Sequence, residues 1–138
     1  MLRGCVVRSL LLCVWYVSAL TLPRCPKTTD GFNLLQGIRA KQPSWGSETL
    51  LYTPTHLQYR SCPSFSMGCI ESEMKTLLEE WTIDDTRIRV RILRILRVLK
   101  LPKNQEQDCE SCELFSEEPA PVFLDFLNST FQEMNSSC

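Results

Sequence analysis

Cysteines are the residues in this chain whose chemistry is easiest to narrow down. Six of the eight cysteines lie beyond residue 20, at Cys25, Cys62, Cys69, Cys109, Cys112 and Cys138. An even number indicates disulfides in an oxidising compartment, although the count leaves the pairing open. Zinc is the competing interpretation, but the gap between Cys62 and Cys69 is looser than in zinc fingers, and the chain has one histidine, His56. The CESC sequence lacks the strand–helix–strand surroundings of a thioredoxin-like site. We therefore predict disulfides.

The other polar residues form no recognisable catalytic motif. The sequence contains no GxSxG, no HExxH and no glycine-rich phosphate loop. Two carboxylate pairs, Asp84/Asp85 and Glu117/Glu118, have no obvious partner base or metal ligand, and we interpret them as negative charge at helix N-termini. We predict a protein that is not an enzyme and holds no cofactor or metal.

The first 20 residues have the pattern of a secretory signal peptide. Arg3 and Arg8 precede an apolar run, Leu10–Leu20, with small residues at a suitable cleavage position. An N-terminal membrane anchor is the alternative, but the run is too short to span a bilayer. Residues 21–138 would then form one secreted domain, and loss of the two arginines would change the formal net charge from −1 to −3. That charge gives no reason to expect nucleic acid as a partner.

Apolar residues recur with a helical period in three segments. Each repeats the spacing 0, +4, +7, +8 and +11, which places side chains on one face of a helix. The segments are Ile70–Trp81, Ile88–Leu99 and Phe123–Met134. Asp84 and Asp85 are suited to cap the second segment, and Pro121 marks the start of the third. RIRVRI alternates as a strand would, but its segment is too long and too regular at the helical period for a strand.

A weaker helical pattern precedes these three segments. Asp30 is suited to cap this helix, and Pro43 ends it. Gly31 and Gly37 each disfavour the helix by about 1 kcal/mol relative to alanine. The apolar face consists of Phe32, Leu34, Leu35 and Ile38.

The lengths of the connections indicate how the four predicted helices are arranged. The connections contain about 25, 4 and 18 residues. A short link joins antiparallel neighbours, whereas a long link can cross the full bundle and let consecutive helices run parallel. We therefore predict an all-α fold, an up-up-down-down four-helix bundle with two long crossover loops. Both chain ends then lie at one end of the bundle, so we expect a disulfide between Cys25 and Cys138, with an intermolecular bridge as the alternative.

Several short motifs resemble the interleukin-2, interleukin-15 and interleukin-21 family of short-chain helical cytokines. They are ETLLYT at 48–53, Cys62 and Cys69 seven residues apart, Cys109 and Cys112 three residues apart, FL at 123–124, and Gln132 nine residues after Phe123. ETLLYT resembles the interleukin-15-like members, whereas the two cysteine pairs and PAPVFL also resemble interleukin-21. The compact leader differs from the long leader typical of interleukin-15, which favours an interleukin-15-like paralogue.

The resemblance implies a secreted cytokine that acts on lymphocytes. Such a cytokine binds a sushi-domain alpha receptor chain, like that of interleukin-15, and signals through a beta chain and the common gamma chain. The implied disulfides join Cys62 to Cys109 and Cys69 to Cys112. The implied receptor contacts are Tyr52, Glu73 and Glu80 for the alpha chain, Asp85 and Arg89 for the beta chain, and Gln132 for the gamma chain. Arg89 stands where the family tends to have a neutral polar residue.

Two sequons lie near the C-terminus and begin at Asn128 and Asn135. A glycan on Asn128 would cover Gln132, which follows one helical turn later on the same face. We expect low occupancy at Asn128, because a helix that packs soon after synthesis presents its asparagine less well than a loop does.

The third predicted helix is strongly basic. We interpret its cations as a solvated face opposite the core. The alternative, from a different functional class, is a secreted cationic effector that binds membranes or glycosaminoglycans. The cations are Arg87, Arg89, Arg91, Arg94, Arg97 and Lys100.

Overall fold

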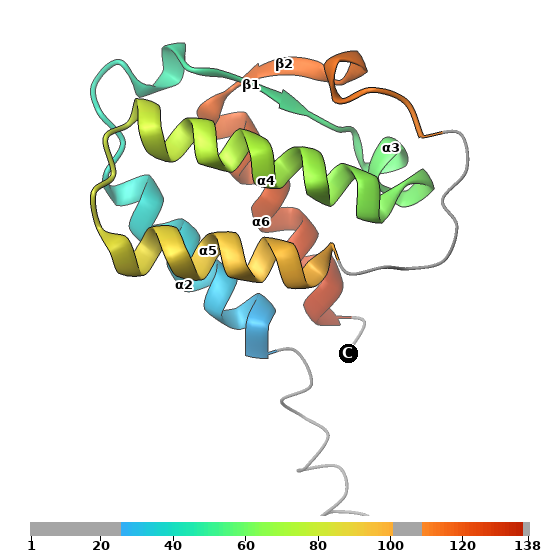
Figure 1. Cartoon of the computed structure of the whole chain (residues 1–138), viewed down its shortest axis with the longest axis horizontal. Coiled ribbons are helices and arrows are strands. Elements are labelled where there is room, and N and C mark those ends of the chain that lie inside the picture. Colours follow the sequence, from blue (N-terminus) through green and yellow to red (C-terminus); the bar gives the residue numbers. More distant parts are fainter. Residues whose placement is uncertain (1–25, 101–108, 137–138) are drawn as a thin grey trace, which may run out of the picture.

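The computed structural model describes residues 26–100 and 109–136, and this part of the chain is mostly helical (Figure 1). The predicted signal peptide and the predicted Cys25–Cys138 bridge lie outside the described residues. None of the helices in those residues has the length and apolar character needed to cross a membrane.

Four long helices enclose the core, and their order along the chain agrees with the predicted order. They are α2 (Pro26–Ala40), α4 (Pro63–Glu80), α5 (Thr86–Leu99) and α6 (Ala120–Ser136). Helix α2 packs against α5 and α6, and α4 packs against α5. Fully buried side chains from all four helices meet in the core; among the largest are Leu35, Ile38, Met67, Ile70, Met74, Leu77, Ile92, Phe123 and Phe131.

The three periodic segments form helices, and most residues of the predicted faces are buried, whereas Ile88, Leu99 and Met134 are half-buried. RIRVRI belongs to α5, and Ile92, Ile95 and Leu96 of that helix are buried. Asp85 caps α5, because its Oδ1 accepts hydrogen bonds from the backbone N–H groups of Arg87 at 3.0 Å and Ile88 at 3.4 Å. Helix α6 begins at Ala120, one residue before the predicted start.

The prediction that Asp30 caps the first helix is wrong. Helix α2 begins at Pro26, whose fixed φ suits the first helical position, so Asp30 lies inside the helix. Its carboxylate instead pairs with Arg91 of α5. Gly31 allows α2 and α6 to approach closely, since a Cβ added there would lie 2.6 Å from Cε2 of Phe131. The glycine that weakens the helix therefore permits its packing.

The two long connections contain regular structure that the sequence analysis did not predict. The first contains the 3-10 turn η1 (Gly46–Glu48), strand β1 (Leu50–Thr53) and the short helix α3 (His56–Ser61). The second contains η2 (Cys112–Leu114) and strand β2 (Ser116–Pro119). The strands pair antiparallel, with Leu50 opposite Pro119 and Thr53 opposite Ser116, and form a two-stranded ribbon alongside α4 (Figure 1).

Two disulfides fasten the second connection to α4 and to Cys62, the residue that directly precedes this helix. They join Cys62 to Cys109, with the Cα atoms 5.9 Å apart, and Cys69 to Cys112, with the Cα atoms 5.7 Å apart. These are the two pairings that the family resemblance implied. Disulfides of this kind are typical of proteins that fold in an oxidising compartment.

Candidate functional site

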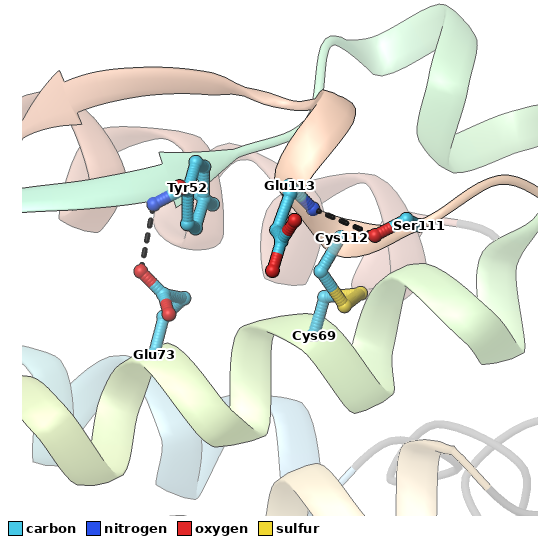
Figure 2. Close-up of a disulfide and its surroundings, with 6 residues drawn as sticks. All are labelled: Tyr52, Cys69, Glu73, Ser111, Cys112 and Glu113. Atoms are coloured by element: carbon cyan, nitrogen blue, oxygen red, sulfur yellow. Dashed lines mark hydrogen bonds between the residues drawn. A yellow bond between two sulfur atoms is a disulfide. The ribbon is translucent and has the colours of Figure 1, made fainter.

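The backbone of β1 is tied to α4 by a carboxylate. Oε2 of Glu73, a half-buried residue of α4, accepts a hydrogen bond of 2.7 Å from the backbone N–H of Tyr52 (Figure 2). The carboxylate thus satisfies a part-buried backbone donor of β1. Two of the residues expected at the alpha-chain site are thus in direct contact.

Acidic side chains from three elements surround Tyr52. Glu117 of β2 lies opposite Tyr52 in the strand pairing, and its negative charge is the largest influence on the Tyr52 hydroxyl. Glu113 of η2 lies beside the Cys69–Cys112 disulfide (Figure 2), and its charge acts on Tyr52. The charge of Glu80, at the end of α4, acts on Glu73. We call these five residues, Tyr52, Glu73, Glu80, Glu113 and Glu117, the acidic surface.

The negative charges of the acidic surface lie close enough together to raise the pKa values of two of its residues. The negative charge of Glu117, then burial, a hydrogen bond to Glu117 and the charges of Glu113 and Glu73 raise the pKa of Tyr52. Burial, and the charges of Glu117 and Glu80, raise the pKa of Glu73, although the hydrogen bond from Tyr52 opposes the shift. An opposite charge from a partner would relieve this repulsion, so the surface is suited to bind a cationic protein.

Sequence reasoning missed Glu113 and Glu117. Glu117 was interpreted as charge at the N-terminus of the last helix, but it lies in β2 and faces Tyr52. The signal for Glu113 was present in the expected Cys69–Cys112 bridge, which carries the residue after Cys112 to α4, one turn from Glu73. The signal for Glu117 was absent, because the strand pairing joins segments that lie far apart in sequence.

The two residues expected at the beta-chain site both have structural roles. Asp85 is the N-cap of α5, and Nη1 of Arg89 donates a hydrogen bond of 3.5 Å to the carbonyl of Ile83 in the turn between α4 and α5. Substitution of either residue would therefore alter this turn as well as any receptor contact.

Helix α6 exposes the residue expected at the gamma-chain site. Gln132 is exposed, as its position outside the apolar repeat predicted. Asn128, one turn earlier, is half-buried, and its Oδ1 is buried with no hydrogen-bond partner among the described residues. Thr130, which completes that sequon, is 1% exposed and donates a hydrogen bond to the Phe126 carbonyl. The folded helix therefore conceals part of the Asn128 sequon.

The second sequon lies at the C-terminal end of α6. Asn135 is exposed, and its Oδ1 accepts a hydrogen bond of 3.3 Å from the Thr28 hydroxyl. This contact joins the first turn of α2 to the last turn of α6, so the two helix ends lie together.

No group of three or more His, Cys, Asp or Glu side chains within residues 26–100 and 109–136 is arranged to hold a metal ion.

Comparisons of the chain with protein-family models, with curated proteins and with solved structures find no match.

Proposed function

We propose that this chain is a secreted interleukin-15-like cytokine that folds as an up-up-down-down four-helix bundle. Two observations support the topology. The two longest connections pair with each other along the bundle as β1 and β2, and the start of α2 contacts the end of α6 through Thr28 and Asn135. Two disulfides among the described residues support secretion.

The acidic surface is the single observation that carries the receptor assignment. It unites the three residues that the resemblance implied for the alpha chain with two more carboxylates from a different connection. In this proposal the surface meets basic side chains of a sushi-domain alpha receptor chain. A beta chain binds near Asp85 and Arg89, and the common gamma chain binds the exposed face of α6 at Gln132. Assembly of the beta and gamma chains then activates the kinases attached to them inside a lymphocyte.

Reversing two charges of the acidic surface tests the alpha-chain site. We expect Glu80→Lys/Glu117→Lys to weaken binding of a soluble interleukin-15-type sushi domain by about 10- to 100-fold, because like charges would face each other across the interface. The binding is measured by surface plasmon resonance. Glu73 is left intact because it holds the Tyr52 backbone, so Glu73→Lys would also disturb β1.

Glu48→Lys/Glu79→Lys is the matched control for the alpha-chain test. It reverses two exposed acids outside the acidic surface and makes the same change in net charge. Equal loss of binding in both double variants, or unchanged binding in the first, would remove the alpha chain from the acidic surface. Signalling through a gamma-containing receptor with no alpha-chain binding by the wild-type protein would favour the interleukin-21-like alternative.

A paired measurement tests the gamma-chain site. We expect glycan occupancy at Asn128 to be low in protein secreted by mammalian cells, because its sequon threonine is buried in α6, and we expect Gln132→Asp to lose most signalling while it retains alpha-chain binding. Glycopeptide mass spectrometry measures occupancy, and phosphorylation of the receptor-associated transcription factor measures signalling. High occupancy together with full activity of Gln132→Asp would contradict the site.

A further inference from the structure

The outer face of α5 concentrates positive charge. Thr86–Leu99 contains five arginines and no acidic residue. Arg87, Arg91 and Arg94 follow one another at intervals of about one helical turn, so they share one side of the helix with Arg97 at its margin. We call these four arginines the basic face.

Ion pairs mark the two edges of the basic face. Arg91 pairs with Asp30 of α2 on one side, and Nε of Arg97 lies 2.7 Å from Oε2 of Glu71 of α4 on the other. Even so, the side chains of Arg91 and Arg97 remain 52% and 60% exposed. Arg87 and Arg94, between these edges, are exposed and have no ion-pair partner within the described part of the chain.

A hollow lies at the edge of the basic face that meets α2. It has a volume of about 220 Å³ and is lined by Asp30, Arg91, Arg94, Ile95 and Val98. Arg91 and Arg94 both line this hollow, so an anionic group held there would lie near two arginine side chains. Only Asp30 opposes that charge there, and it is already paired with Arg91.

The buried side of α5 distinguishes between two possible anionic partners, a lipid membrane and a soluble anionic polymer. A cationic helix that binds a membrane must bury its apolar face among the lipids. Here Ile92, Ile95 and Leu96 form that face, and all three are buried in the protein core. The basic face itself offers only Val90 and Val98 as apolar residues, and Val90 is 45% exposed. A partner that presents anionic groups and requires no apolar contact therefore fits this face better than a bilayer does.

We propose that the basic face of α5 binds a sulfated glycosaminoglycan. The repeated sulfate groups of such a polymer match a row of guanidinium groups, each of which can donate two hydrogen bonds to one sulfate. The surface is separate from the acidic surface and from Gln132 on α6. Binding there would hold the secreted protein at the cell surface and leave the proposed alpha- and gamma-chain sites free, whereas the proposed beta-chain residues, Asp85 and Arg89, belong to the same helix and flank Arg87 in sequence.

Binding to heparin, in the absence of any receptor, tests this proposal on the full secreted chain. We expect Arg87→Gln/Arg94→Gln to weaken heparin binding by about tenfold at 0.15 M salt, because two charge contacts are lost. These two arginines are chosen because they form no ion pair that stabilises the described fold. The elution salt concentration from heparin should fall in the same variant, whereas N- and O-desulfated heparin should bind neither protein.

Lys41→Gln/Arg60→Gln is the charge-matched control. It removes one exposed cation that follows α2 and one on α3, and it should leave heparin binding unchanged. Equal weakening in both double variants, or no weakening in the arginine variant, would overturn the proposal. Tighter binding to vesicles of phosphatidylserine and phosphatidylcholine than to heparin, with loss in the arginine variant, would instead assign the face to a membrane. Alpha-chain binding is measured separately, so failure here leaves the receptor proposal intact.

Discussion

Replacing Cys62 and Cys109 together with alanine is expected to lower the free energy of unfolding by about 3 kcal/mol. Alone, this bridge closes a loop of 47 residues in the unfolded chain, for which chain entropy gives about 4 kcal/mol. The Cys69–Cys112 bridge already holds nearly the same loop closed. With that bridge in place, Cys62–Cys109 closes only a small ring of about ten residues, made of segments 62–69 and 109–112. Closing this ring contributes about 3 kcal/mol.

The two bridges should therefore contribute more than additively when both are removed. Removing either one costs about 3 kcal/mol, and removing the second costs about 4 kcal/mol more, since the last constraint on the long loop then disappears. Urea unfolding of wild type, both double alanine variants and the quadruple variant measures this. Two independent losses that sum to the quadruple value would contradict the shared-loop explanation. The quadruple variant can be tested by secreted yield if it does not fold.

The second large effect is expected at a carboxylate enclosed by α4 and α5. Glu71 is 6% exposed, and it accepts hydrogen bonds from Nε of Arg97 at 2.7 Å and from Nζ of Lys100 at 3.3 Å. We expect Glu71→Gln to destabilise the fold by about 2 to 3 kcal/mol, because two charge-assisted hydrogen bonds lose their anion. Both cations are partly exposed and can be hydrated, which keeps the loss below that of a fully buried pair. Glu79→Gln, at an exposed position of the same helix, should change stability little.

The effect of Glu71 should depend on pH. Burial alone would raise its pKa, but hydrogen bonds from Arg97 and Lys100 and the charges of Lys100 and Lys75 outweigh burial and lower the pKa below the ordinary value of 4.5. The stabilisation by ionised Glu71 is therefore complete above that value and is lost as the pH falls through the lowered pKa. The stability difference between wild type and Glu71→Gln should be constant above about pH 6 and shrink in acid.

Glu73→Gln provides a contrast of opposite sign in the same helix. Burial raises the pKa of Glu73, so its ionised form is disfavoured in the folded protein, and wild type gains stability as the pH falls through the raised pKa. The stability of wild type relative to Glu73→Gln should thus improve in acid while that relative to Glu71→Gln declines. Urea unfolding at several pH values measures both stability differences. If the two differences changed in the same direction as the pH falls, the environments assigned to Glu71 and Glu73 would be contradicted.

The sequence predicted those parts of the fold that local patterns determine. The apolar repeats of α4, α5 and α6 and the cap at Asp85 depend on residues that are neighbours in sequence. The cap assigned to Asp30 was wrong because the pattern could not show that Pro26 starts α2 a full turn earlier or that Arg91 would occupy the carboxylate. A polar residue near a helix start satisfies either a backbone donor or a distant cation, and only the packing of α2 on α5 decides which.

The candidate site was also predictable only in part, because some of its residues are brought together by contacts between distant segments. The resemblance supplied Tyr52, Glu73 and Glu80, and the structure adds Glu113 and Glu117 through the pairing of β1 with β2. SEEP has no alternation of apolar and polar residues and ends in proline, so nothing local identifies it as a strand. Its pairing depends on a partner strand that precedes α4, and a single sequence carries no signal for that contact.

The β1–β2 ribbon also has a consequence for the order of folding. Leu50 pairs with Pro119, and the intervening chain includes the whole of α4 and α5, so the ribbon has a high contact order. Helices α4 and α5 need only a short turn to meet and can form early, whereas the ribbon must wait for closure of the long loop. We expect the acidic surface, which the ribbon assembles, to mature last. If the acidic surface binds a receptor chain, as we propose, a partly folded chain would lack that surface and could not yet bind it.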